Sequence, residues 1–199
     1  MGQSAKKTGK TYEMDMCSGP LFPKIVAFAV PLILSGILQL LFNAADIIVV
    51  GHFAGRESLA AVGSTTALIN LMINVFVGLS IGANVLVAQY SGAKKLKDLE
   101  ETVHTAMMLA LAGGFFLIFV GVFFSGPMLG LMGTPDDVLP LAALYLKIYF
   151  IGMPATLTYN FGAAILRAVG DTRRPLYFLL FAGAVNVVLN LVFVIAFSM

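Results

Sequence analysis

Residues 25–50 read IVAFAVPLILSGILQLLFNAADIIVV, and this apolar stretch contains a single charged side chain, that of Asp46. The stretch exceeds the about 20 residues that a helix needs to cross a bilayer. A charge at bilayer depth costs about 3 kcal/mol or more on insertion scales, so an acid there indicates a functional site by default. The stretch predicts a membrane-spanning helix with Asp46 as an ion-coupling residue. The alternative is an acid near the outer surface that stays hydrated.

The rest of the chain has the same character. Hydrophobic residues make up 59% of it and charged residues 11%, with a mean hydropathy of +0.95, whereas soluble proteins average about 45–50% and about 25%. A membrane β-barrel is a poor alternative, because its strands are segments of about 10 residues with alternating polarity, and these apolar runs are longer and do not alternate. We therefore predict an all-α membrane protein, a polytopic bundle of about five transmembrane helices. The predicted helices lie near 25–50, 59–90, 103–124, 139–165 and 176–197.

The basic residues predict the orientation in the membrane. Ten of the twelve lysines and arginines lie in segments 1–24, 94–97 and 167–174, on the same side of the predicted spans. Short loops rich in Lys and Arg stay in the cytoplasm. We expect a multi-pass protein of the cell membrane, with residues 1–23 as a cytoplasmic N-terminal tail and residues 24–199 as the transmembrane domain.

Polar side chains recur at helical spacing inside the apolar runs. Residues three or four positions apart share one face of a helix. Two interpretations stay open, a bundle that lines a wet cavity and polar contacts that hold helices together in the bilayer. The cavity-lining candidates are Gln39, Asn43, Asn70, Asn74, Thr156 and Asn160, and a further pair on the last helix is Asn186 and Asn190.

Asp46 and Asn190 could meet in the outer half of the membrane. Counted from the outer ends of their runs, their depths differ by about 5 Å at 1.5 Å per residue, and their helices cross in the same direction. A carboxylate beside amides can hold a proton, or coordinate sodium through oxygen atoms. Earlier in the first helix, Pro31 and Gly36 predict a deformable bend. The alternative is a static kink, which membrane helices tolerate.

Other functions find little support in the residues. The sequence contains no nucleotide-binding P-loop. His52 and His104 are expected on opposite sides of the membrane and cannot share a metal ion, and Asp136 and Asp137 adjoin in a predicted external turn. An intramembrane enzyme would need a nucleophile with its base, or a metal cluster. We therefore expect no enzyme activity, no cofactor, no metal beyond a possible sodium ion at Asp46, and no nucleic-acid partner.

Six short motifs together resemble the multidrug and toxic compound extrusion (MATE) family. They keep the order and spacing of that family, and the resemblance covers residues 23–199. The motifs are PLILSG at 31–36, ADIIVVG at 45–51, LAAVG at 59–63, VAQYSGA at 87–93, LRAVGDT at 166–172, and Asn186-x-x-x-Asn190.

The resemblance implies a transporter of twelve helices in two six-helix lobes that exports cationic, often aromatic, drugs in exchange for proton or sodium. It implies ion coupling at Asp46, Asn186 and Asn190, and a helix bend at Pro31. One branch of the family has an aspartate where this chain has Asn190, so both ions remain possible.

Family members run to roughly twice 199 residues. We therefore expect a chain truncated at its C-terminus, with an incomplete first lobe and the C-terminal half of the transporter missing. The alternatives are a flippase for a lipid-linked substrate and a non-transporting accessory membrane protein.

Overall fold

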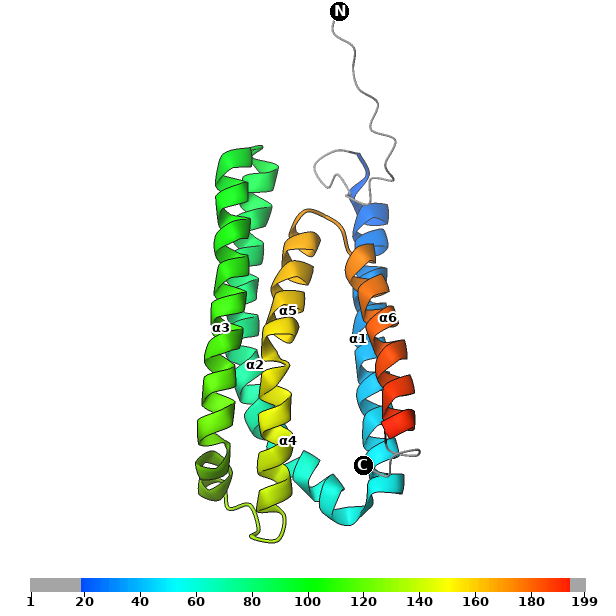
Figure 1. Ribbon diagram of the computed structural model, residues 1–199. Helices are drawn as coiled ribbons and strands as arrows, with labels where there is room; N and C mark the ends of the chain where they lie inside the picture. The colour runs from blue at the N-terminus through cyan, green and yellow to red at the C-terminus, as the bar shows by residue number, and fades with distance from the viewer. Residues whose placement is uncertain (1–18, 194–199) are drawn as a thin grey trace, which may run out of the picture.

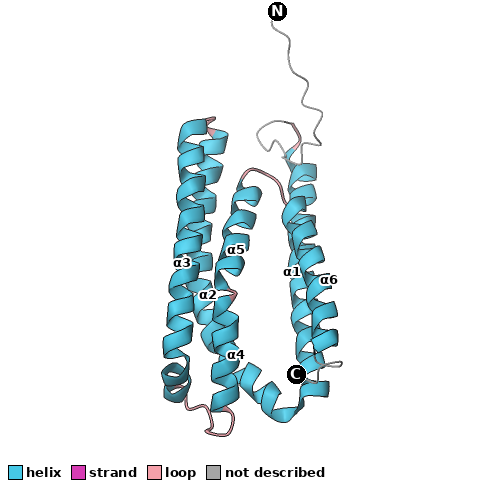
Figure 2. Ribbon diagram, in the orientation of Figure 1, coloured by secondary structure: helices cyan, strands magenta, loops and turns pink. Residues whose placement is uncertain are grey.

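The computed structural model describes residues 19–193, and every regular element in that range is helical (Figures 1 and 2). The predicted tail therefore lies almost wholly outside the described residues, as does the end of the last predicted span. The elements are α1 (Leu21–Val49), the π-helical turn η1 (Val50–Ala54), α2 (Gly55–Gly92), α3 (Leu96–Leu131), α4 (Leu139–Ile151), α5 (Met153–Ala168) and α6 (Arg173–Leu191).

The helices have the length and composition of membrane spans. Four single helices qualify, and α4 with α5 gives a fifth span that is bent by 49°. The prediction of about five transmembrane helices is confirmed. The sequence predicted one helix over 139–165, but the structure divides this region at Gly152. Pro154 follows in the first turn of α5, and a proline inside a helix would remove one hydrogen bond and clash with the preceding turn.

The two longest helices extend past the bilayer core. α2 has 38 residues and α3 has 36, so they measure about 57 and 54 Å at 1.5 Å per residue. The hydrocarbon core is only about 30 Å thick. The turn that joins them lies at the same end of the bundle as the start of α1 (Figure 1). This end of the α2–α3 hairpin therefore reaches the membrane surface or projects beyond it.

The helices form two groups in Figure 1. α1 lies beside α6, while α2, α3, α4 and α5 pack together around α3. Small residues line the buried face of α3, where a Cβ on Gly114 would overlap the backbone of Pro154 and one on Gly121 would overlap Phe150. Without a hydrophobic driving force between helices in lipid, close approach at small residues supplies the packing energy. The buried small residues of α3 are Ala106, Ala110, Gly114, Gly121 and Ser125.

Two connections join the α1–α6 pair to the other four helices. η1 leads from α1 into α2, where Gly55 has a positive φ of 86°. The loop between α5 and α6 contains the buried Asp171, whose Oδ1 accepts hydrogen bonds from the backbone N–H groups of Arg173 and Arg174 at 3.0 and 3.1 Å. Its Oδ2 lies 3.1 Å from Arg174 Nε. This aspartate satisfies N–H groups that the first turn of a helix leaves open, and it fixes where α6 begins.

Candidate functional site

Asp46 and Asn190 lie against each other where α1 packs on α6. The Nδ2 of Asn190 donates a hydrogen bond to Oδ1 of Asp46, across 144 residues of sequence, and both side chains are half-buried. The contact requires closely packed helices. Gly183 permits this approach, because a Cβ at that position would overlap the ring of Phe42 on α1.

The pair leaves oxygen atoms for a further ligand. An ionised carboxylate is a pure acceptor with two oxygens, and an asparagine amide supplies one more. With the amide nitrogen donating to one Asp46 oxygen, the second carboxylate oxygen and Oδ1 of Asn190 are still able to accept. The arrangement can therefore hold a proton or contribute oxygens to a small hard cation. Among residues 19–193, no cluster of three or more His, Cys, Asp or Glu residues could hold a metal ion.

A tyrosine pair on α4 includes one residue within electrostatic range of this site. Tyr145 is within electrostatic range of the Asp46 carboxylate. Its ring is 6.2 Å from that of Tyr149, one turn along the same helix. Both tyrosines are half-buried. Tyr145 was not among the predicted site residues, because nothing in the sequence indicates that it lies within electrostatic range of Asp46.

The other predicted residues are distributed over α1, α2, α5 and α6. Asn186 lies one turn from Asn190 and is exposed. Gln39, Asn43, Asn70 and Asn74 are also exposed, whereas Thr156 and Asn160 are half-buried. A cavity between α2, α3 and α5 is lined by other residues. The six cavity-lining candidates therefore keep that role only as a prediction.

The predicted bend at Pro31 lies inside a continuous helix. α1 runs through Pro31 from Leu21 to Val49, and Pro31 is its one buried residue. The Ser35 hydroxyl donates to the Pro31 carbonyl at 2.7 Å, which is the local bond that serines and threonines make inside helices. Gly36 has open space around the position of a Cβ. A bend at this segment stays a prediction.

Comparison with known proteins identifies the family. The sequence model of the MatE family matches residues 31–192, which is most of the chain. The chain belongs to the MatE family. This confirms the resemblance inferred from the six motifs, and the match includes both Asp46 and Asn190.

Curated relatives of this MatE-family chain are about two and a half times as long as the segment of them that the chain matches. It is 30% identical over 185 residues to the probable multidrug resistance protein YpnP of Bacillus subtilis, covering 93% of this chain and 42% of that protein. It is 25% identical over 176 residues to the FAD transporter of Shewanella oneidensis, covering 88% and 38%. The chain thus spans about two-fifths of the length of these curated relatives.

Solved MatE-family structures have the same fold. An outward-facing multidrug resistance MATE transporter of the MOP superfamily matches with a TM-score of 0.82 at 26% identity, over 88% of this chain and 39% of that one. An inward-facing conformation described in the same words matches with a TM-score of 0.75, over 86% and 40%. The outward-facing structure therefore matches this chain with the higher TM-score.

Sequence analysis of this MatE-family chain missed one polar contact between helices. Asn84 Nδ2 on α2 donates to the Ala164 carbonyl on α5 at 2.6 Å. An asparagine within an apolar run was the available signal, but no other amide lies three or four residues from Asn84. Buried polar groups in lipid need a hydrogen-bond partner, so this contact ties α2 to α5.

Proposed function

We propose that this chain is the N-terminal part of an ion-coupled multidrug antiporter that exports cationic or aromatic compounds across the cell membrane. The observation that carries the proposal is the hydrogen bond from Asn190 to Asp46 inside the membrane-spanning part of a MatE-family chain. Helix packing alone does not need an ionisable group, and intramembrane acids mark ion pathways. The coupling ion is sodium or a proton.

The proposed coupling acts on the contact between α1 and α6. A proton on Asp46 makes the carboxyl group a donor as well as an acceptor, and a sodium ion would occupy its oxygens. Either event offsets the negative charge that strengthens the hydrogen bond from Asn190. An ion can shift a conformational equilibrium only by binding one arrangement better than another. Ion binding at Asp46 would therefore favour an arrangement in which α1 and α6 pack differently.

The choice of ion can be tested with Asn190→Ala in the full-length transporter. Sodium takes oxygen ligands, so the amide oxygen of Asn190 would help to hold sodium and would do little for a proton. In proteoliposomes driven by a sodium gradient at fixed pH, we expect the substitution to raise the sodium concentration for half-maximal efflux about tenfold. One lost ligand contact of about 1.4 kcal/mol corresponds to that factor.

The matched control is Gln89→Ala, which removes an exposed amide on α2 that is not among the predicted site residues. It should have a smaller effect on sodium dependence. Efflux that a pH gradient alone drives fully, and that Asn190→Ala leaves unchanged, would contradict the sodium version and leave Asp46 as a proton carrier.

A second candidate function is export of an anionic aromatic compound. It is favoured by the similarity to the FAD transporter of Shewanella oneidensis. Transport by the full-length protein of a fluorescent organic cation should be compared with transport of FAD under the same ion gradient. Movement of FAD without movement of the cation would replace the multidrug proposal with this one.

The proposed cytoplasmic N-terminus is open to a labelling test. The α2–α3 turn and the 132–138 turn lie at opposite ends of the bundle (Figure 1). After replacement of Cys17, single cysteines at Lys95 and Asp136 should differ in whole cells. We expect a membrane-impermeant maleimide to label Asp136→Cys and to leave Lys95→Cys unlabelled until the cells are opened. The reverse pattern would invert the proposed orientation.

A further inference from the structure

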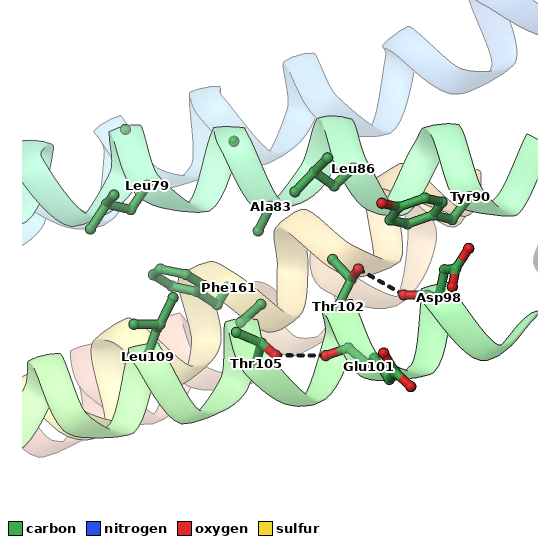
Figure 3. Close-up of a pocket in the computed structure, with 13 residues that line it drawn as sticks. Leu79, Ala83, Leu86, Tyr90, Asp98, Glu101, Thr102, Thr105, Leu109 and Phe161 are labelled. Carbon is green, nitrogen blue, oxygen red and sulfur yellow. Dashed lines mark hydrogen bonds between the residues drawn. The ribbon is translucent and has the colours of Figure 1, made fainter. Parts of the chain in front are cut away.

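A cavity of about 480 Å³ between α2, α3 and α5 opens on the surface of the bundle (Figure 3). Leu79 on α2 and Leu109 on α3 line it, and each is 52% exposed. The buried Phe161 contributes from α5. Around a membrane-spanning bundle, the medium that meets such an open apolar surface is the hydrocarbon of the bilayer.

The cavity has about the length of one bilayer leaflet. Its lining residues on α2 extend from Gly78 to Tyr90, which is about 18 Å at 1.5 Å per residue, and half of the hydrocarbon core is about 15 Å. Figure 3 shows Tyr90 and Asp98 together at one end of the cavity and Leu79 and Leu109 toward the other. Tyrosines are enriched where the membrane meets water. A lipid can therefore lay an acyl chain along the cavity with its headgroup at the Tyr90 end.

Two glycines on α2 leave room for that chain. Gly78 and Gly82 are one turn apart and both line the cavity. Nothing lies within 4 Å of the position that a Cβ would occupy on either residue. No packing contact therefore requires a glycine there, and a large side chain at Gly82 would project into the space that an acyl chain needs.

The polar end of the cavity presents charges of both signs. Asp98 and Glu101 on α3 line it. Lys95 Nζ lies 4.0 Å from Asp98 Oδ2, and the two side chains are 62% and 47% exposed. Lys94 and Lys97 are exposed in the same segment. An ion pair that is this long and this exposed contributes little, so both of its charges can engage a charged headgroup.

The negative side of this end offers hydrogen-bond acceptors. The Thr102 hydroxyl donates to the Asp98 carbonyl at 2.7 Å, and the Thr105 hydroxyl donates to the Glu101 carbonyl at 2.8 Å, so both hydroxyl hydrogens are engaged within α3. Ionised carboxylates only accept hydrogen bonds, and a primary ammonium carries three N–H donors. A trimethylated ammonium has no N–H group and cannot make these bonds.

We propose that this cavity binds phosphatidylethanolamine, a membrane lipid whose headgroup carries a primary ammonium and a phosphate. One acyl chain lies against the leucines and Phe161. The ammonium donates to Asp98 and Glu101, and the phosphate lies toward Lys95. Complementary charge gives specificity. Adjacent charges of both signs select a zwitterionic headgroup over an anionic one, whose phosphate would face two carboxylates without an ammonium between them.

The lipid site is distinct from the proposed coupling site. Neither Asp46 nor Asn190 lines the cavity. The cavity lies toward the end of the bundle where α2 turns into α3, which is also the end where α1 begins (Figure 1), and Asp46 is about 38 Å along α1 from Leu21 at 1.5 Å per residue. Lipid binding therefore does not depend on which ion or compound the transporter moves.

The test is native mass spectrometry of the purified chain in detergent, titrated with lipids that have identical acyl chains. Phosphatidylcholine is the matched probe, since it differs from phosphatidylethanolamine only by three N-methyl groups. We expect one phosphatidylethanolamine per chain to bind about 2- to 13-fold more tightly than phosphatidylcholine, the effect of one hydrogen bond. Phosphatidylglycerol, which has the phosphate without an ammonium, should also bind more weakly.

The headgroup contacts are tested one charge at a time. Asp98→Leu with Glu101→Met keeps the approximate size of both side chains and removes their acceptor oxygens, so the two zwitterionic lipids should then bind alike. Lys95→Gln should weaken both by about 1.5- to 5-fold and keep the preference, because both carry the phosphate. Glu100→Met changes an exposed acid outside the cavity and should leave both affinities unchanged.

A filled cavity provides an independent variant. Gly82→Phe should abolish the preference for phosphatidylethanolamine, whereas Gly63→Phe, on the same helix with equally open surroundings, should retain it. Circular dichroism and a single elution peak check that each variant is folded. If Gly82→Phe does not fold, the double substitution at Asp98 and Glu101 decides the matter alone.

Three results would overturn the proposal. The first is equal binding of phosphatidylethanolamine and phosphatidylcholine to the unsubstituted chain, which indicates a lipid layer without headgroup recognition. The second is binding of phosphatidylglycerol as tight as that of phosphatidylethanolamine, which indicates a site made by the lysines alone. The third is a preference for phosphatidylethanolamine that survives the double substitution, which places its site elsewhere on the chain.

Discussion

Asp46→Asn in the full-length transporter is expected to reduce ion-driven efflux to the level of liposomes without protein. The asparagine keeps the size of the side chain and can still accept a hydrogen bond from Asn190 through its carbonyl oxygen. It cannot take up a proton, and it brings no negative charge to sodium. The substitution therefore removes the proposed coupling chemistry while the contact between α1 and α6 can persist.

Efflux of a fluorescent cation from proteoliposomes, under a sodium gradient and separately under a pH gradient, measures this effect. Asp136→Asn is the matched control, since it makes the same change at an exposed acid in the 132–138 turn. The variant protein should insert and elute like the wild type. If its efflux is nevertheless normal, Asp46 is a hydrated acid near the surface and not the coupling residue.

Gly114→Ala is expected to lower the stability of the helix bundle by about 1–3 kcal/mol, the usual cost of overpacking a filled core. A Cβ at this position would overlap the backbone of Pro154 at the start of α5. A flexible side chain can rotate away from an added methyl group, but a helix backbone can only move as a unit. The substitution should therefore push α3 and α5 apart.

The midpoint of thermal unfolding in detergent, compared with that of the wild type, measures the loss. Gly126→Ala is the control on the same helix, where nothing lies within 4 Å of the added atom. It should be neutral or slightly stabilising, because alanine is the better helix former by up to about 1 kcal/mol. Equal midpoints for the two variants would show that close packing at Gly114 does not limit stability.

Most of the secondary structure could be predicted because a lipid bilayer imposes it. Every backbone polar group in the hydrocarbon must be paired within the protein, so long apolar runs become helices whatever their neighbours are. The same constraint made Asp46 conspicuous as the one charge in residues 25–50. Its depth, compared with that of Asn190 on a helix running the same way, was enough to expect the two side chains to meet.

The features that were not predicted depend on how the helices pack. The bend at Gly152 changes the direction of a span without changing its hydropathy. The cavity between α2, α3 and α5 depends on the relative rotation of three helices, which polar stripes on single helices did not determine. The small residues of α3 were the available signal, since Ala106, Ala110 and Gly114 recur every four positions, a spacing typical of close helix contacts in membranes.

The separation of Asp46 from Asn190 has a consequence for biosynthesis. The two residues are 144 positions apart, and a ribosome adds about 5–20 residues per second. Asp46 is therefore synthesised about 7–30 seconds before Asn190. During that interval the insertion machinery must accommodate a carboxylate that lacks its final partner. Newly made chains arrested between α5 and α6 should therefore be held at the translocon, and should be the species that membrane quality control removes first.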